Sequence, residues 1–149
     1  MIVGDTVVYE VTYPASPTRV WRSLTDAAEL AAWLMPVHGD VSSVGARFTM
    51  ACDPIGEVAA EVLEVDPPRR LSWRWVGAFG TTTVTFTLQP DGTGTRLRLE
   101  HDGWDRTNVA SRDQFESGWD HKLHAELAGV LDRDATRTSR APRWPSAPR

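Results

Sequence analysis

The sequence is poor in cysteine and has no long apolar run. Among 149 residues only Cys52 carries a thiol, which excludes an internal disulfide and a cysteine-rich zinc site and fits a reducing compartment. No stretch approaches the roughly 18 apolar residues of a membrane-spanning helix. The first residues also lack the basic start and apolar run of a secretory signal. These absences predict a soluble, cytoplasmic protein with a structural thiol and no membrane span.

Positive charge is scarce in most of the chain. Residues 1–134 hold all 20 acidic residues but only 12 of the 16 basic ones, and the other four basic residues are arginines within residues 135–149. Binding to a phosphate backbone requires a basic face, so the acidic body argues against a nucleic-acid partner. The arginine- and proline-rich stretch has no periodicity and is predicted to be a disordered tail. The remaining residues, 1–134, are expected to form one domain. The protein is expected to be a monomer or a homodimer.

The first part of the chain has the pattern of a strand followed by two short helices. Residues 6–13 are rich in β-branched and aromatic side chains, which is typical of a strand. Ser16 before Pro17 predicts the start of one helix, and Asp26 predicts the N-cap of a second. After a loop that contains Gly39 and Gly45, hydrophobic residues alternate with polar ones for some fifty residues. This alternation predicts five strands, at residues 47–50, 57–65, 71–75, 81–88 and 95–101.

The end of the domain has a helical period. The turn at residues 90–94 predicts a hairpin, and the short connections predict an antiparallel sheet. Beyond residue 111, large apolar side chains recur every four residues and predict one long amphipathic helix, at Phe115, Trp119, Leu123, Leu127 and Leu131. Gly118 lies inside this helix, either because the helix approaches the sheet or a ligand closely or because the position tolerates glycine. The predicted fold class is α+β, with a curved antiparallel sheet covered by the last helix.

Several stretches resemble a known superfamily. The run YEVTYPASPTRVWRSLTD at residues 9–26 resembles the opening of the START/SRPBCC superfamily, which has the helix-grip fold of the birch-pollen allergen. VLEVDPPRRLSW at residues 62–73, TVTFTL at 83–88 and Gly118-Trp119 are similar to its branch named for an activator of a heat-shock chaperone ATPase. EHDGWDR at residues 100–106, with Gly118-Trp119, is similar to self-sacrificing resistance proteins for enediyne antibiotics. The resemblance covers residues 6 to about 132 and implies an apolar cavity between sheet and last helix.

Tryptophan is frequent, with seven residues against two tyrosines. Large aromatics either fill a core or line a pocket for flat, greasy ligands. The ligand hypothesis places these residues around the cavity: Trp33, Phe48, Met50, Trp73, Trp75, Phe86, Leu99, His101, Trp104, Phe115, Trp119 and Leu123. The alternative is that the same side chains close-pack and leave no cavity.

The histidines suggest chemistry only weakly. His101 shares a strand face with Leu99 and could orient a ligand or act as a general acid or base, or it could be a satisfied core residue. Trp104 could shape the cavity mouth or anchor the core. His121 and His124 have a spacing compatible with metal binding, but the apolar stripe places His121 on a solvated face. The sequence predicts no metal site, no cofactor and no identifiable catalytic residue.

Three functions follow from these patterns. The first is binding of a hydrophobic, aromatic or polyketide-like small molecule in the cavity. The second is a cyclase, dehydratase or hydrolase that uses the same cavity, and the third is an interaction protein, either a chaperone activator or a self-sacrificial protein against an enediyne-type antibiotic. The single lysine among 16 basic residues predicts a high-GC, actinobacterial source, which favours a polyketide or antibiotic ligand.

Overall fold

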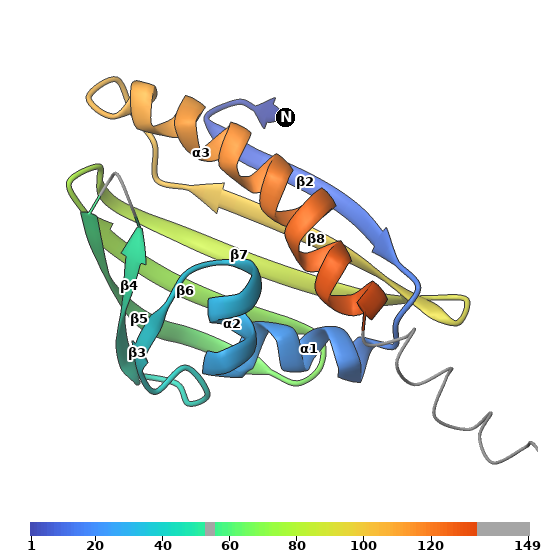
Figure 1. The fold of residues 1–149 in the computed structure, drawn as a ribbon. Coiled ribbons are helices and arrows are strands. Elements are labelled where there is room, and N and C mark those ends of the chain that lie inside the picture. Colours follow the sequence, from blue (N-terminus) through green and yellow to red (C-terminus); the bar gives the residue numbers. More distant parts are fainter. Residues whose placement is uncertain (53–55, 134–149) are drawn as a thin grey trace, which may run out of the picture.

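A computed structural model describes residues 1–52 and 56–133 (Figure 1). Its elements follow in this order: β1 (Ile2–Val3), β2 (Thr6–Tyr13), α1 (Pro17–Thr25), α2 (Ala27–Trp33), β3 (Val37–Gly39), β4 (Arg47–Cys52), β5 (Gly56–Asp66), β6 (Arg70–Gly77), β7 (Gly80–Asp91), β8 (Gly94–Asp102), α3 (Val109–His121) and the π-helical segment η1 (Lys122–Leu127). Residues 128–133 continue the last helix as α-helix. The predicted tail, residues 135–149, and the predicted domain end at residue 134 lie outside the described residues.

The strands form one antiparallel sheet in the order β1-β2-β8-β7-β6-β5-β4-β3. Figure 1 shows the sheet bending around the last helix, which lies along β2 and β8, while α1 and α2 cover the other end of the same face. α1 contacts β7 and β8, and α2 contacts β3 and η1. The predicted α+β helix-grip fold is confirmed.

The two short helices begin where the capping residues predict. The Ser16 side chain accepts a hydrogen bond from the backbone N–H of Arg19 at 3.2 Å, and Pro17 occupies the first helical position. The Asp26 carboxylate accepts from the N–H of Ala28 at 2.9 Å at the start of α2. Each cap satisfies a backbone donor that the helix itself leaves unpaired.

The core lies between the concave face of the sheet and the helices. Strand alternation sends every second side chain inward, and the inward rows of the three central strands are fully or nearly fully buried: Leu71, Trp73 and Trp75 on β6, Thr82, Val84, Phe86 and Leu88 on β7, and Leu97, Leu99 and His101 on β8. The outer rows carry paired charges instead, such as Arg74 with Glu61 at 2.7 Å. Alternation along β6 and β8 therefore identified the core face correctly.

The last helix contains a π-helical segment that the sequence did not predict. In an α-helix a four-residue repeat overshoots a full turn by about 40° at each step, or about 160° from Phe115 to Leu131. All five members of the repeat are nevertheless buried. The wider turn of η1 has i→i+5 hydrogen bonds and absorbs the excess rotation. Within it, the carbonyl of Leu123 accepts a hydrogen bond from the buried Tyr13 hydroxyl at 2.8 Å.

Two short strands were missed. β1 has two residues and pairs with β2, and β3 places Gly39 in a strand paired with Phe48 of β4, where the sequence predicted a loop. Segments this short carry too few alternations to be recognised. At Gly39 the backbone has φ of +123°, and an added Cβ would lie 2.6 Å from the Arg47 carbonyl oxygen. No helix of the described residues is long and apolar enough to cross a membrane.

The hairpin between β7 and β8 supplies a stability prediction. An added Cβ at Gly94 would overlap the Tyr13 carbonyl oxygen, a backbone atom that cannot swing aside. Gly94→Ala is therefore expected to lower the free energy of unfolding by about 1–3 kcal/mol, measured by urea denaturation. Thr93→Ala, at the exposed neighbouring position, is the control and should stay within about 0.5 kcal/mol of the wild type. Equal effects of the two substitutions would contradict the predicted overlap.

Candidate functional site

One side of α3 borders a half-open cleft of about 740 Å³. Its opposite wall is the connection from α2 to β3 together with the end of β4, and β6 contributes to the space between them. We call this the cleft, and it is lined by Leu34, Met35, Pro36, Ala51, Cys52, Trp75, Asp113, Gln114, Phe115, Ser117, Gly118, Trp119 and Lys122. Aliphatic and aromatic side chains dominate, and the polar groups come from α3 and η1.

Aromatic rings form one wall of the cleft. Trp75 of β6 and Trp119 of α3 stack with ring centroids 5.8 Å apart and an interplanar angle of 17°. Trp73 stacks on Trp75 in turn, with ring centroids 6.2 Å apart and an interplanar angle of 15°. Phe115 lies 5.9 Å from Trp75 at a tilt of 50°. Trp75 lies between the rings of Trp73 and Trp119, so the strand and the helix together form a closely packed apolar wall on this side of the cleft.

His101 fixes the orientation of Trp119 from beneath this surface. The Trp119 indole N–H donates to Nδ1 of His101 at 3.0 Å, so Nδ1 is the acceptor and the proton of the neutral ring lies on Nε2. Nε2 is 2.8 Å from the Thr82 hydroxyl and donates to it. The Trp104 indole N–H donates to the His101 backbone carbonyl at 2.9 Å. A chain of hydrogen bonds thus runs from β7 through β8 to α3.

The environment of His101 keeps its ring neutral. The side chain is completely buried, and burial lowers the pKa of His101 to about 3. Both ring nitrogens are engaged by Thr82 and Trp119, and His101 does not line the cleft. This arrangement is that of a positioning residue: it holds an indole of the cleft wall and offers no free nitrogen for proton transfer.

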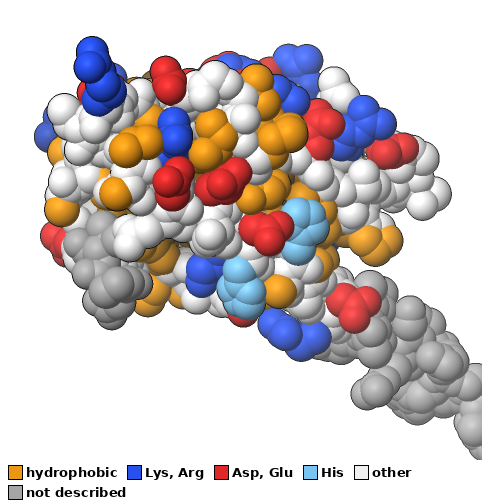
Figure 2. All heavy atoms as spheres, turned by 90° about the horizontal axis from the view of Figure 1, so that it is seen from above, with side chains coloured by type: hydrophobic (Ala, Val, Ile, Leu, Met, Phe, Trp, Pro, Cys, Tyr) orange, Lys and Arg blue, Asp and Glu red, His pale blue; other side chains and the backbone are white. Residues whose placement is uncertain are grey.

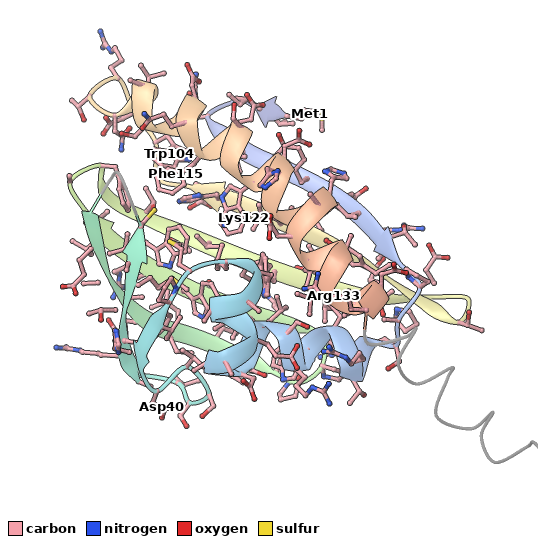
Figure 3. The ribbon with its side chains drawn as sticks, in the orientation of Figure 1. Met1, Asp40, Trp104, Phe115, Lys122 and Arg133 are labelled. Carbon is pink, nitrogen blue, oxygen red and sulfur yellow. The ribbon has the colours of Figure 1, made fainter. Side chains whose placement is uncertain are left out.

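Two further features distinguish the cleft. An added Cβ at Gly118 meets no atom within 4 Å, although the residue lies mid-helix and lines the cleft. The indole N–H groups of Trp73 and Trp75 are both buried without a hydrogen-bond partner in residues 1–52 and 56–133, and of these two residues only Trp75 lines the cleft. Figure 3 shows Phe115 and Lys122 on the side of the last helix that faces α2 and the sheet. The helix therefore leaves open space at Gly118 on the side that lines the cleft. Aromatic rings and the ammonium of Lys122 lie on either side of this space.

Comparison with known proteins assigns the family. Residues 14–132 match the sequence profile of the family described as activator of Hsp90 ATPase homolog 1-like protein. The chain belongs to this family. The resemblance stated from the sequence is thereby confirmed. No curated protein matches the sequence of this Hsp90-activator-like chain.

Solved structures agree with this assignment. A Mesorhizobium loti protein is 34% identical, with a TM-score of 0.80 over 86% of this chain and 97% of its own. DynU16, a protein of the dynemicin biosynthetic locus, is 27% identical with a TM-score of 0.73, over 87% of this chain and 48% of its own. CalU16 from Micromonospora echinospora is 24% identical with a TM-score of 0.69, over 95% of this chain and 87% of its own, and supports the fold alone. The chain spans about half the length of DynU16.

The structure distributes the twelve predicted ligand residues between cleft and core. Trp75, Phe115 and Trp119 line the cleft of the Hsp90-activator-like chain. The other nine are buried outside its lining, namely Trp33, Phe48, Met50, Trp73, Phe86, Leu99, His101, Trp104 and Leu123. Trp33, for example, donates its N–H to the Ser23 carbonyl at 2.8 Å. Close packing therefore accounts for most of the concave face, and the cleft lies at one end of it.

Ten lining residues were not among the predicted ones. The wall formed by Leu34, Met35 and Pro36 belongs to a connection whose position depends on the tertiary fold, and local periodicity carries no signal for it. Two signals were present on the helix. Gly118 stood out as a glycine inside the helix, explained either by close approach to the sheet or a ligand or by tolerance, and Lys122 is the one lysine of the chain.

The two exposed histidines of the last helix form contacts with acidic side chains of the same helix. His121 Nε2 is 3.0 Å from Glu126, and His124 Nδ1 is 3.0 Å from Asp120. Figure 2 shows histidine side chains at the surface beside acidic ones. Among the described residues no group of three or more histidine, cysteine or acidic side chains could hold a metal ion. These side chains form a solvated face of the helix.

Proposed function

We propose that this Hsp90-activator-like chain binds a hydrophobic, aromatic small molecule in the cleft. The observation that carries the proposal is the aromatic wall of Trp75, Phe115 and Trp119 that borders a half-open space of about 740 Å³. Ligand pockets of proteins typically enclose about 300–1,000 Å³, have mostly apolar walls and contain a few polar groups. The cleft has all three properties.

The energetics favour a ligand with fused or linked rings. Each 100 Å² or so of apolar ligand surface removed from water contributes about 2.5 kcal/mol before entropic losses. The unpartnered N–H of Trp75 is a donor whose burial costs about 1–3 kcal/mol. A carbonyl or hydroxyl oxygen on the ligand that reaches this N–H would recover part of that cost, so an oxygenated aromatic such as a polyketide fits better than a hydrocarbon.

The proposal is tested by titrating the protein with a panel of polycyclic aromatic and polyketide-type compounds. We expect saturable quenching or a shift of the tryptophan fluorescence, with micromolar dissociation constants. The stacked indoles of Trp75 and Trp119 line the cleft, so a bound aromatic molecule changes their surroundings. Trp75→Phe is expected to keep the apolar wall but to weaken binding of oxygenated compounds severalfold. Silence across the whole panel, in fluorescence and in calorimetry, would contradict ligand binding.

The similarity to DynU16 favours a second candidate function. DynU16 comes from the dynemicin biosynthetic locus and shares 27% identity with this chain over 87% of its length. This relation supports a self-sacrificial role, in which the protein intercepts a reactive antibiotic and is itself consumed. Exposure to an activated enediyne should then cut the backbone at a defined position, giving two fragments by mass spectrometry. Intact mass after exposure, with reversible binding, would leave the ligand-binding function as the better account.

A further inference from the structure

Lys122 introduces the only lysine ammonium of the chain into the cleft. It is the first residue of η1 and lines the cleft together with Gly118 and Trp119. Its side chain is half-buried. Figure 3 shows it below the helix, toward the space between α3 and α2. A positive charge therefore lies at the edge of an otherwise apolar surface.

The ammonium of Lys122 has no ion pair or hydrogen bond with the described part of the chain, and the carboxylates nearest to it along the helix are engaged elsewhere. Three contacts account for them: Glu116 with the N-terminal ammonium of Met1 at 2.9 Å, Asp120 with His124 at 3.0 Å and Glu126 with His121 at 3.0 Å. The charge of Lys122 is thus available to a molecule in the cleft.

The cleft is electrically asymmetric. Its one acidic lining residue, Asp113, lies nine residues before Lys122, about 13 Å along the helix axis. The Asp113 carboxylate is 3.4 Å from the guanidinium of Arg112, which also lies 3.7 Å from the Asp5 carboxylate. The wall of Trp75, Phe115 and Trp119 between these ends is uncharged. The cleft therefore combines an apolar centre with one lining cation, Lys122, at the end away from Asp113.

We propose that the ligand of the cleft is an amphipathic anion, an inference that rests on the proposed ligand-binding function. The aromatic body packs against the apolar wall of the cleft, formed by Trp75, Phe115 and Trp119, and a carboxylate, sulfonate or phenolate oxygen accepts a hydrogen bond from Nζ of Lys122. A half-buried ammonium without a partner has lost part of its hydration, and only an anionic acceptor compensates for this loss fully. A neutral ligand of the same shape gains the apolar packing but leaves the ammonium uncompensated.

The test uses two fluorescent probes with the same anilinonaphthalene body. 1-Anilinonaphthalene-8-sulfonate carries one negative charge, and N-phenyl-1-naphthylamine is neutral. We expect Lys122→Met to weaken binding of the sulfonate about tenfold and to change binding of the neutral probe less than twofold. Lys122→Arg, which keeps the charge, should retain most of the affinity for the sulfonate. Added salt should weaken binding of the sulfonate more than binding of the neutral probe, because salt screens the attraction between partly exposed opposite charges.

Arg133→Met is the matched control. It removes one positive charge from the same helix, eleven residues and about 16 Å beyond Lys122, and should leave both probes unaffected. Equal losses of sulfonate affinity in Lys122→Met and Arg133→Met would assign the effect to net charge and overturn the proposal. Equal losses of both probes in Lys122→Met would also overturn it. Failure of both probes to bind the wild type would count against the proposed cleft function itself, whereas binding of the neutral probe alone would overturn only the preference for an anion.

Discussion

Replacing His101 by phenylalanine is expected to lower the free energy of unfolding at pH 7 by about 2–5 kcal/mol. Phenylalanine keeps an aromatic ring but removes both hydrogen bonds of the imidazole. The Trp119 N–H then loses its acceptor and the Thr82 hydroxyl loses its donor. Both groups are buried beside His101, so water cannot replace the lost partners. Each unsatisfied buried group costs about 1–3 kcal/mol, more than the small gain from the apolar ring.

The same substitution is expected to change the pH dependence of stability. Burial lowers the pKa of His101 to about 3 in the folded protein from 6.5 when exposed. Between these values the unfolded chain binds a proton that the folded chain does not, so stability is full above about pH 6.5 and falls as the pH drops toward 3. By pH 4 the wild type should have lost about 3 kcal/mol through this residue alone. The phenylalanine variant lacks this loss.

Urea denaturation at pH 7, 5.5 and 4 measures both effects. Titration of the carboxylates is common to the two proteins, so the difference between wild type and His101→Phe isolates the histidine. That difference should shrink steadily as the pH falls. His121→Phe, which replaces an exposed histidine of the same chain, is the control for the loss of an imidazole as such. A difference that stays constant from pH 7 to pH 4 would show that His101 does not gain a proton on unfolding in this range.

Gly118→Phe is expected to abolish binding in the cleft while preserving the fold. An added Cβ at this position meets no atom within 4 Å, so the new ring enters open space beside Trp119. The ring would occupy the volume that the ligand needs, and we expect affinity to fall at least tenfold. Glycine in the interior of a helix is also unfavourable by about 0.5–1 kcal/mol, so the variant should be at least as stable as the wild type.

The second glycine of the last helix gives a matched control. Gly129 lies outside the lining of the cleft, and an added Cβ there makes only an ordinary contact with Arg133. Gly129→Phe should therefore leave affinity unchanged. Calorimetric titration of both variants with the same ligand, together with thermal denaturation, separates blocking from unfolding. Retained affinity in a folded Gly118→Phe protein would place the binding site elsewhere.

Local patterns were sufficient to predict most of the fold. Ser16 and Asp26 marked the helix starts because capping is a contact between neighbours in the sequence. Alternation on β6 and β8 identified the buried rows because a strand with one covered face imposes a period of two. β1 and β3 were missed because each is defined by its pairing with the next strand of the chain, and pairing leaves no local trace in segments of two or three residues.

The site was less predictable for a different reason. Sequence patterns distinguish inward from outward side chains, but not an inward side chain that touches another from one that borders open space. Trp73 and Trp75 share a face and a residue type, yet only Trp75 lines the cleft. The opposite wall at Met35 and Pro36 depends on where α2 is placed across the sheet. Hydrogen bonding of His101 to Trp119 likewise joins residues that meet only in the folded chain.

The π-helical segment sets the rotational phase between two halves of the last helix. η1 and the helical turns after it are anchored in the core by the buried side chains of Leu123, Leu127 and Leu131, and the Tyr13 hydroxyl donates a hydrogen bond to the Leu123 carbonyl. The half before it presents the cleft surface. Because a π-turn holds about one residue more than an α-turn, conversion of η1 to α-helix with all its residues kept would, with the leucines still anchored, rotate the preceding half by about 100°. Such a conversion would exchange the row of side chains that the helix presents to the cleft, whereas deleting one residue within η1 at the same time would keep that row in place.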